Sequence, residues 1–312
     1  MQIRRYDESA KNRWDDFLSN AKNYHFFFHR DYLAYHEGRF EDFSLLIYDD
    51  KEKLIALLPA NREGKRLYSH QGLTYGGFIV NDNMKVVTMI RIFEALKSYL
   101  HAAGIEEVVY KTVPHIHHRK PAEEDRYALF LQDARLLQRD IAATIDMRAG
   151  VKYSNGRKWS LKKAAKEGFE VVESEDFSAF WALLEEILYQ QHGAKPVHSL
   201  EEIALLHARF PKNIRLFLNY RAGELLAGAV VFENPDIVHL QYVANSNEGR
   251  VIGALDYIID HLIKTVYREK AFFDFGTSNE EDGRRLNEGL IDQKERFGAR
   301  AVAIDRYLWS VR

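Results

Sequence analysis

A group of polar residues follows a short apolar stretch in the last third of the sequence. Asp274 lies within the stretch Ala271–Phe275, and Ser278 and Glu280 come shortly after it. Ligands of α/β sheets bind at the carboxyl ends of strands, so these three side chains are candidates to position or deprotonate an amine, directly or through a water molecule. The structural alternative is that Asp274 accepts backbone N–H groups in a tight turn and that Glu280 caps the next helix.

Two further candidates stand on neighbouring predicted elements. Tyr242 follows Gln241 in the middle of a predicted strand, where alternation places one of the two side chains on each face. A phenol that faces a cleft can donate a proton, whereas one that faces the core only needs a partner for its hydroxyl. Lys294 falls on a helix after the polar loop, where its ammonium either reaches a carboxylate or phosphate of a substrate or lies exposed at the surface.

A basic cluster begins near residue 155. Arg157, Lys162 and Lys163 lie with Lys158 and Lys166 on one predicted helix. Such a run is usually a solvated helix face. The functional interpretation is an anion site for a CoA phosphate, a nucleotide-linked sugar or the acceptor end of a tRNA.

The composition excludes several classes of protein. The chain has 312 residues and no cysteine, which excludes disulfides, thiolate zinc sites and cysteine nucleophiles. The 44 basic and 46 acidic residues nearly balance, so no overall field attracts nucleic acid and we expect no DNA partner. The motifs of P-loop NTPases, dinucleotide enzymes, serine hydrolases and zincins are absent. Aromatic residues make up 13% of the chain, which is high for a plain core and leaves rings to line a groove.

The sequence also bears on metal binding and location. His115, His117 and His118 precede Pro121 in a stretch that we interpret as a surface loop, so we predict no metal. The N-terminus lacks the apolar region of a signal peptide, and the longest strongly apolar stretch, Leu225–Phe232, is too short to cross a bilayer. We therefore expect a cytoplasmic protein without membrane insertion, and the sequence leaves its oligomeric state open.

Hydrophobic periodicity predicts short strands that alternate with amphipathic helices. The predicted helices cover residues 14–18, 31–36, 86–102, a stretch from about 155, and 252–266. The predicted strands cover residues 43–48, 54–61, 107–111, 127–131, 139–145, 214–220, 225–232, 238–244 and 271–275. Residues 67–80 are predicted to form an irregular, glycine-rich strand region, and residues 249–253 a loop. This pattern predicts an α/β fold with mixed sheets.

The order of hairpin, helix and strand occurs twice. The offset is 171 residues from Leu45 to Leu216 and 165 residues from Glu106 to Ala271. A nearly constant offset indicates duplication of one unit, and the alternative is the chance recurrence of common α/β units. We place the boundary near residues 149–150, which gives domains 1–150 and 151–312.

The order of motifs resembles the FemAB-like branch of the GNAT acyltransferase superfamily. The strongest part is Phe273–Ser278, a strand ending in Asp-Phe-Gly, followed by Lys294–Gly298 with the pattern Lys-x-x-Phe-Gly. Leu58-Pro59, Tyr75-Gly76-Gly77 and Arg157–Ala164 also agree with the family, so that the resemblance covers the chain from about Phe28 to Tyr307. It implies two tandem GNAT-like domains, each a mostly antiparallel mixed sheet flanked by helices.

The resemblance implies that acyl-CoA is a co-substrate, held by backbone amides at a helix N-terminus within Arg/Gln-x-x-Gly-x-Gly/Ala. Gly249, Arg250, Gly253 and Ala254 supply part of this pattern, but Leu255 replaces its last small residue. Residues 80–83, before the equivalent helix of the first half, contain neither arginine nor glycine. We therefore expect a degenerate donor site in the first domain and the active half in the second.

The resemblance also implies an acceptor site on the first loop of the second domain, although ordinary loop residues are an alternative. Tyr75 is added because a ring at a strand end can line a substrate groove. The candidate acceptor contacts are His192, Lys195, His198, Tyr75, Ser278 and Lys294.

The implied function is transfer of an acyl group from acyl-CoA to an amine of an amino sugar or cell-envelope precursor, so the partner is a small-molecule or glycan-precursor substrate. Glu280, Tyr242 and Asp274 are the catalytic candidates, and Tyr242 would protonate a leaving thiolate as in many GNAT enzymes. One alternative is FemAB-type aminoacyl transfer from tRNA, against which the sequence shows no long heptad arm. Another is a catalytically silent fold that binds a sugar or peptide.

Overall fold

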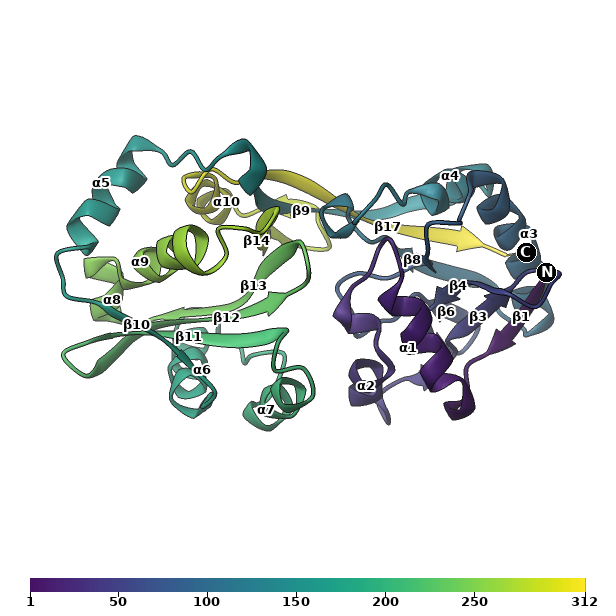
Figure 1. Cartoon of the computed structure of the whole chain (residues 1–312), viewed down its shortest axis with the longest axis horizontal. Coiled ribbons are helices and arrows are strands. Elements are labelled where there is room, and N and C mark those ends of the chain that lie inside the picture. The colour runs from purple at the N-terminus through teal and green to yellow at the C-terminus, as the bar shows by residue number, and fades with distance from the viewer. Residues whose placement is uncertain (312) are drawn as a thin grey trace. The chain divides into compact units, whose positions relative to one another are not determined.

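The computed structural model describes residues 1–311, except for the side chain of His192. The chain forms two compact units (Figure 1). The first contains Met1–Asp140, Asn279–Arg285 and the residues from Ala303 onward, and the second contains Ile141–Ser278 and Leu286–Val302. The sequence boundary near residue 150 therefore falls inside the second unit, and most of the last strand of the chain, from Ala303 onward, belongs to the first.

The first unit has two groups of paired strands. One has the order β1 (Gln2–Arg5), β3 (Leu45–Tyr48), β4 (Leu54–Leu58) and β7 (Ile79–Val80), with antiparallel pairs throughout. The other has the order β17 (Arg300–Ser310), β8 (Glu107–Lys111), β6 (Arg66–Tyr68), β5 (Asn61–Glu63) and β2 (Glu41–Asp42). Only β6 and β8 pair in parallel within this second group.

Helices flank these strands. They are α1 (Lys11–Ser19), α2 (Arg30–Leu33), α3 (Val86–Ala102) and α4 (Glu124–Leu131), with 3₁₀ turns at Glu8–Ala10, Phe26–Phe28, Ala34–His36 and His115–His117. The longest, α3, buries Met89, Phe93, Leu96 and Leu100 at helical spacing, which explains why periodicity alone located it.

The second unit is built on one mixed sheet. Its strands follow the order β10 (Glu170–Ser174), β11 (Ile214–Arg221), β12 (Glu224–Glu233), β13 (Ile237–Asn245), β14 (Phe272–Thr277) and β9 (Arg135–Asp146). The pair β13–β14 is parallel and the other pairs are antiparallel. Helices α6 (Ser178–His192) and α7 (Leu200–Arg209) lie on one face and α9 (Ala254–His261) on the other (Figure 1).

The remaining elements of the C-terminal half of the sequence are short. They are α5 (Asn155–Ala164), α8 (Asn247–Ile252), α10 (Glu288–Glu295), a 3₁₀ turn at Met147–Ala149, a π-helical turn at Leu262–Val266, and the strands β15 (Asn279–Glu280) and β16 (Arg285–Leu286). A capping box at Ser199 and Glu202 starts α7. Along residues 1–311, no helix is both long and apolar enough to cross a membrane.

The predicted mixed α/β fold with two tandem units is confirmed. Helix α3 and strand β8 begin and end at the predicted residues, and the predicted strands around residues 45, 216, 228 and 240 are all present. Each unit therefore repeats the order hairpin, strand, helix and strand, as β3-β4-β7-α3-β8 and as β11-β12-β13-α9-β14.

Three local predictions are wrong. Residues 127–131, predicted as a strand, belong to helix α4, whose Asp125, Ala128 and Leu129 are buried at helical spacing. Residues 249–253, predicted as a loop, mostly form helix α8, because the Ser246 side chain caps its start. The predicted strand 54–61 is divided between β4 and β5, with Pro59, which lacks a backbone N–H, between them.

Candidate active site in the second unit

Strands β13 and β14 pair only at their beginnings. Residues 237–239 pair in parallel with residues 272–274, and no further pair joins the two strands. Just beyond, Val230 of β12 pairs with Tyr242 while Val231 pairs with Leu240, which leaves Gln241 as an extra residue in β13. A β-bulge of this kind bends its strand. The sheet therefore opens between β13 and β14 after His239 and Asp274.

A cavity of about 230 Å³ occupies this opening, which we call the β13–β14 slot. Its polar lining comes from Gln241, Gln293 and Lys294. Its apolar walls are Leu240, Val243, Leu255, Ile259, Phe275, Leu290 and Phe297, from β13, β14, α9, α10 and the turn after α10. An apolar pocket with a few polar groups is the usual form of a small-molecule site.

Lys294 contributes a buried ammonium to the slot. Its Nζ donates hydrogen bonds to the carbonyl oxygens of Gly276, at 3.1 Å, and Thr277, at 2.7 Å. Burial lowers the pKa of Lys294 from 10.5 to about 8, and the nearby Asp274 acts in the opposite direction. The sequence alternative of a surface lysine does not apply, because only 9% of this residue is exposed.

Asp274 is fully buried and accepts hydrogen bonds from three donors. These are Thr144 Oγ1 at 2.8 Å, His239 Nδ1 at 2.7 Å and the backbone N–H of Gly276 at 3.2 Å. The bond from Gly276 is the tight-turn contact that the structural alternative describes. The bond from His239 adds a second property, because a carboxylate that accepts from Nδ1 leaves Nε2 of a neutral imidazole as an acceptor.

Tyr242 and His198 form a second polar pair. The Tyr242 hydroxyl lies 2.6 Å from His198 Nδ1, and the backbone N–H of His198 donates to it at 3.4 Å. The Trp181 ring of α6 packs against Tyr242 with centroids 5.2 Å apart. Tyr242 pairs with Val230 and His239 with Phe232, two residues apart on β12, so both side chains lie on the α6 side of the sheet.

The predicted donor residues lie at helix α8. The backbone N–H groups of Gly249, Arg250 and Gly253 donate to Ser246 Oγ, Ser246 O and Gly249 O, at 3.0, 2.9 and 2.9 Å. A Cβ at Gly249 would lie 2.6 Å from the Leu226 carbonyl, and Gly253 has a φ of +82°. The local backbone structure therefore accounts for glycine at both positions. Ala254 is buried, and Arg250 is exposed.

The predicted anion residues separate into two groups. Arg157 is buried, is ion-paired with Asp256, and has its guanidinium 4.1 Å above the Phe297 ring. Burial lowers the pKa of Arg157 to about 10. The Arg157 guanidinium is thus paired with a carboxylate of the same chain. Lys162 and Lys163, in contrast, are exposed on the outer face of α5.

The structure places the remaining candidates less closely together. Lys195 is exposed on the loop after α6, and the side chain of His192 is outside the described residues. The Ser278 hydroxyl is buried, with no hydrogen-bond partner among the described residues. Glu280 belongs to a segment grouped with the first unit and pairs with Arg285. Tyr75 is buried in the first unit, against the ring of His117.

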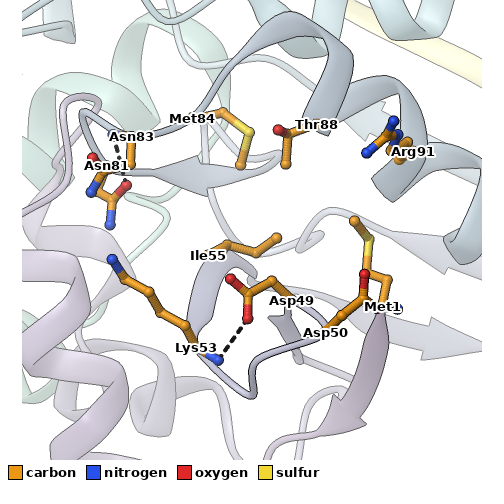
Figure 2. A pocket seen from close by; sticks show the side chains of 10 residues that line it. All are labelled: Met1, Asp49, Asp50, Lys53, Ile55, Asn81, Asn83, Met84, Thr88 and Arg91. Carbon is orange, nitrogen blue, oxygen red and sulfur yellow. Dashed lines mark hydrogen bonds and ion pairs between the residues drawn. The ribbon is translucent and has the colours of Figure 1, made fainter.

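The first unit has a larger hollow of about 550 Å³ near the start of α3 (Figure 2). Its lining carries both signs of charge, with the carboxylates of Asp49 and Asp50 and the cationic side chains of Lys53 and Arg91. Asp49 also accepts a hydrogen bond from the backbone N–H of Lys53, at 2.9 Å. A polar hollow of mixed charge suits an acyl chain less well than the apolar β13–β14 slot.

Sequence reasoning missed His239, Thr144 and Trp181. His239 and Thr144 meet Asp274 only through strand register, since His239 and Thr144 both pair with Asp274 across the sheet. The available signal was Asp274 itself, because a buried carboxylate needs donors on the adjacent strands.

Comparisons with known proteins agree with this architecture. Residues 154–282 match the acetyltransferase (GNAT) domain family. FemX is similar in structure, with a TM-score of 0.69, 12% identity, and coverage of 98% of this chain and 97% of FemX. L-PGS from Bacillus licheniformis has a TM-score of 0.62 at 13% identity, with coverage of 98% of this chain and 92% of L-PGS.

A tandem GNAT protein from the clavulanic acid biosynthesis pathway is also similar. Its TM-score is 0.52 at 11% identity, with coverage of 100% of this chain and 98% of that protein. No curated protein is similar enough in sequence to match. The resemblance seen in the motifs is confirmed at the level of fold. Residues 154–282 thus match a GNAT acetyltransferase domain, and the whole chain has the fold of the tandem GNAT and FemX structures.

Proposed function

We propose that the chain is an N-acyltransferase whose reaction takes place in the second unit. The observation that carries this proposal is the β13–β14 slot, an apolar cavity opened by the bulge at Gln241, with the Lys294 ammonium in its wall. An apolar slot accommodates the acyl arm of an activated carrier, and polar groups beside it suit the reacting carbonyl.

The reaction we propose is direct transfer. The acceptor amine attacks the carbonyl carbon of a thioester or ester, a C–N bond forms, and the carbonyl oxygen becomes an oxyanion. The amine then loses a proton, and the carrier leaves as a thiol or alcohol after gaining one. Lys294 supplies positive charge near the oxyanion, and Tyr242 is the proposed proton donor to the leaving group. Asp274 acts through the side chains that it holds, since it is fully buried.

Acyl-CoA is the first candidate donor. The match of residues 154–282 to an acetyltransferase family supports this donor. The similar tandem GNAT protein also supports it, because the name of its structure refers to AcCoA, as absent from that structure. Because amides of α8 already donate within the helix, we propose the exposed Arg250 as the phosphate contact. Saturating acetyl-CoA should raise the melting temperature, and Arg250→Ala should reduce that shift. No shift at saturation counts against this donor.

Aminoacyl-tRNA is the second candidate, favoured by the outer face of α5. Trp159 is 68% exposed there, beside Lys158, Lys162 and Lys163, and opposite the buried Ala164. Lysines can contact phosphates and an exposed indole can stack on a base. The similarity to FemX and L-PGS is consistent with this candidate. Charged tRNA that binds equally well after Lys162→Glu with Lys163→Glu would contradict it.

The proposed acceptor is an amine of an amino sugar or cell-envelope precursor. The decisive experiment gives the wild-type chain acetyl-CoA or charged tRNA with a panel of such amines and measures transfer by mass spectrometry. Transfer with either donor supports the proposal. No transfer from either donor to any amine would contradict it and would leave a ligand-binding fold as the function.

A further inference from the structure

The two helical walls of the β13–β14 slot differ in character. Helix α9 contributes Leu255 and Ile259, which lie one turn apart and are both aliphatic. The other wall comes from α10 and the turn after it, where four lining residues follow at helical spacing: Leu290, Gln293, Lys294 and Phe297. The slot therefore has one wholly aliphatic wall and one wall that carries polar groups.

The aliphatic wall reaches the deep part of the slot. Ile259 is buried there together with Leu240 and Phe275, whereas Val243 and Gln293 are exposed at the rim. A chain that enters from the rim therefore leaves water as it passes along the α9 wall. Each buried methylene strengthens binding by about fourfold, because its transfer out of water is favourable.

The charge of Lys294 restricts which chains fit. Its buried ammonium has three hydrogens, and its two recorded hydrogen bonds go to the carbonyl oxygens of Gly276 and Thr277. As far as the structure describes the chain, no carboxylate lines the slot. A carbonyl or carboxylate oxygen of a ligand suits this cation, whereas a second ammonium would be repelled with no acidic side chain to offset it.

The volume of the slot limits the length of the chain. The cavity of about 230 Å³ is smaller than the pockets of roughly 300–1,000 Å³ that enclose whole small-molecule ligands. It therefore suits the transferred group rather than the whole carrier. At about 30 Å³ for each group of the size of a water molecule, the cavity accommodates roughly seven or eight chain atoms. An acetyl group would leave most of it empty.

We propose that the β13–β14 slot selects a straight, uncharged aliphatic acyl chain of about six to eight carbons, and that Leu255 and Ile259 determine its length. This inference deepens the proposed function and rests on it. The carbonyl end of the chain lies at Gln293 and Lys294, and the tail lies against the α9 wall. An acetyl group is too short to use this wall, and the ammonium of an aminoacyl group is repelled by Lys294.

The first test measures kcat/KM for acetyl-, butyryl-, hexanoyl-, octanoyl- and dodecanoyl-CoA, with an amine from the panel that accepts an acyl group. The values should rise by about fourfold for each methylene, so that hexanoyl-CoA exceeds acetyl-CoA by more than about 100-fold. They should level off at octanoyl-CoA, where the slot is full. Equal values for acetyl-CoA and hexanoyl-CoA, or transfer from charged tRNA alone, would overturn the inference and leave the proposed function intact.

The second test changes the α9 wall at Leu255, which is only half-buried. Leu255→Phe narrows the slot, so the preference for hexanoyl-CoA over acetyl-CoA should fall by about tenfold or more. Leu255→Ala widens it and should move the optimum toward dodecanoyl-CoA. The matched control is Leu205→Phe, at an exposed leucine of α7 on the other face of the sheet, which should keep the wild-type profile. Unchanged profiles in both Leu255 variants would contradict the role of this wall.

The third test measures binding without turnover. By calorimetry at pH 7, the affinity of the wild type should rise by about fourfold per methylene from butanoate to octanoate. Lys294→Met should weaken the binding of octanoate, and octylammonium should not compete with it. Octanoate that binds no more tightly than butanoate would overturn the inference. If octanoate binds as expected but no donor supports transfer, the proposed function fails, and the assignment of the slot to an aliphatic chain stands.

Discussion

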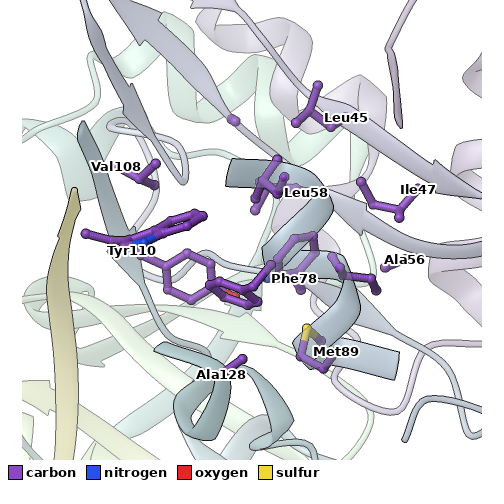
Figure 3. Close-up of a cluster of buried hydrophobic side chains, with 14 of the residues drawn as sticks. Leu45, Ile47, Ala56, Leu58, Phe78, Met89, Val108, Tyr110 and Ala128 are labelled. Atoms are coloured by element: carbon purple, nitrogen blue, oxygen red, sulfur yellow. The ribbon is translucent and has the colours of Figure 1, made fainter. Parts of the chain in front are cut away.

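In each unit, the last two strands of the hairpin–strand–helix–strand order lie apart from each other. What fills the gap between them differs between the two units. In the second unit, β13 and β14 diverge around an apolar cavity. In the first unit, β7 and β8 lie in different sheets, and aromatic side chains pack between them (Figure 3). Phe78, Phe93 and Tyr110 are almost fully buried, with ring centroids 5.5 to 6.2 Å apart.

Hydrogen bonds also close the gap of the first unit. The Phe78 backbone N–H donates to the Tyr110 hydroxyl at 2.7 Å, and that hydroxyl donates to the buried Asp125 at 2.7 Å. In the second unit, Gln241 and Lys294 instead line an open cavity. The comparison teaches that the same order of strands and helix can enclose packed side chains in one unit and an open cavity in the other. It supports assigning the chemistry to the second unit.

The largest expected effect is on stability in the filled gap. Phe93→Ala should lower the free energy of unfolding by about 3–5 kcal/mol, since it removes a fully buried ring. Phe275→Ala, at the wall of the open slot, should cost less because a cavity already adjoins the ring. Urea unfolding of both variants measures the difference. Equal losses would remove the distinction between a filled and an open gap.

Filling the open slot should strongly reduce activity with little effect on stability. Val243→Trp places an indole in the wall of the slot at a residue that is 40% exposed. The rate of acyl transfer should fall about 100-fold or more, which corresponds to roughly 2.7 kcal/mol of lost transition-state binding. The control is Val251→Trp, at an 81% exposed residue of α8. Retention of full activity by Val243→Trp would place the acyl group elsewhere.

Two glycines give a smaller and more specific contrast. Gly77 has a φ of +91°, and an added Cβ would lie 2.8 Å from the Lys111 carbonyl oxygen, so Gly77→Ala should cost about 2 kcal/mol or more in stability. Gly276 has a φ of +70°, and the nearest atom is Cε1 of the His239 ring. Gly276→Ala should cost about 1 kcal/mol of stability but reduce activity more, because it disturbs the turn whose carbonyl oxygen accepts from Lys294 in the wall of the slot. Calorimetry and kinetics on the same two proteins check both parts.

The smallest expected difference between the two units is in the pH range over which a buried lysine changes stability. The Lys111 ammonium donates to the carbonyl oxygens of His70, Gln71 and Leu73, and burial lowers its pKa from 10.5 to about 7. Because the unfolded chain keeps its proton up to the higher pKa, the stability of the wild type should rise between about pH 7 and pH 10 relative to Lys111→Met. The slope should approach 1.4 kcal/mol per pH unit.

The corresponding window for Lys294 starts about one pH unit higher, since its pKa is about 8. Relative to Lys294→Met, the wild type should gain stability only above about pH 8. Urea unfolding in steps of half a pH unit measures both windows. A stability difference that stays flat with pH for either pair of proteins would show that the lysine is not desolvated in the folded state.

Elements with strong local patterns were predictable from the sequence. Helix α3 has Phe93, Leu96 and Leu100 at helical spacing, and β8 is a short apolar run, so both follow from local sequence. Helix α4 was missed because Tyr127 and Phe130 favour strands locally. Its buried residue Asp125 is held by Tyr110 of β8, a contact that no local pattern contains.

The same distinction explains the site. Asp274, Tyr242 and Lys294 were found from residue type and position along the chain, and the structure gives each a polar partner. His239 was missed because its contact with Asp274 depends on the register of two strands joined through α9. Arg157 was predicted as an anion contact, but its partner is Asp256, which the fold brings beneath it.

The most direct measurement maps where the acyl group sits. A donor carrying a photoreactive diazirine in its acyl chain, attached to CoA or to tRNA, is bound, irradiated, and located by peptide mass spectrometry. The account predicts labels within residues 240–243, 255–259 or 290–297, which line the β13–β14 slot, and loss of those labels in Val243→Trp. Labels confined to the first unit, at residues 78–93 or 108–111, would contradict it.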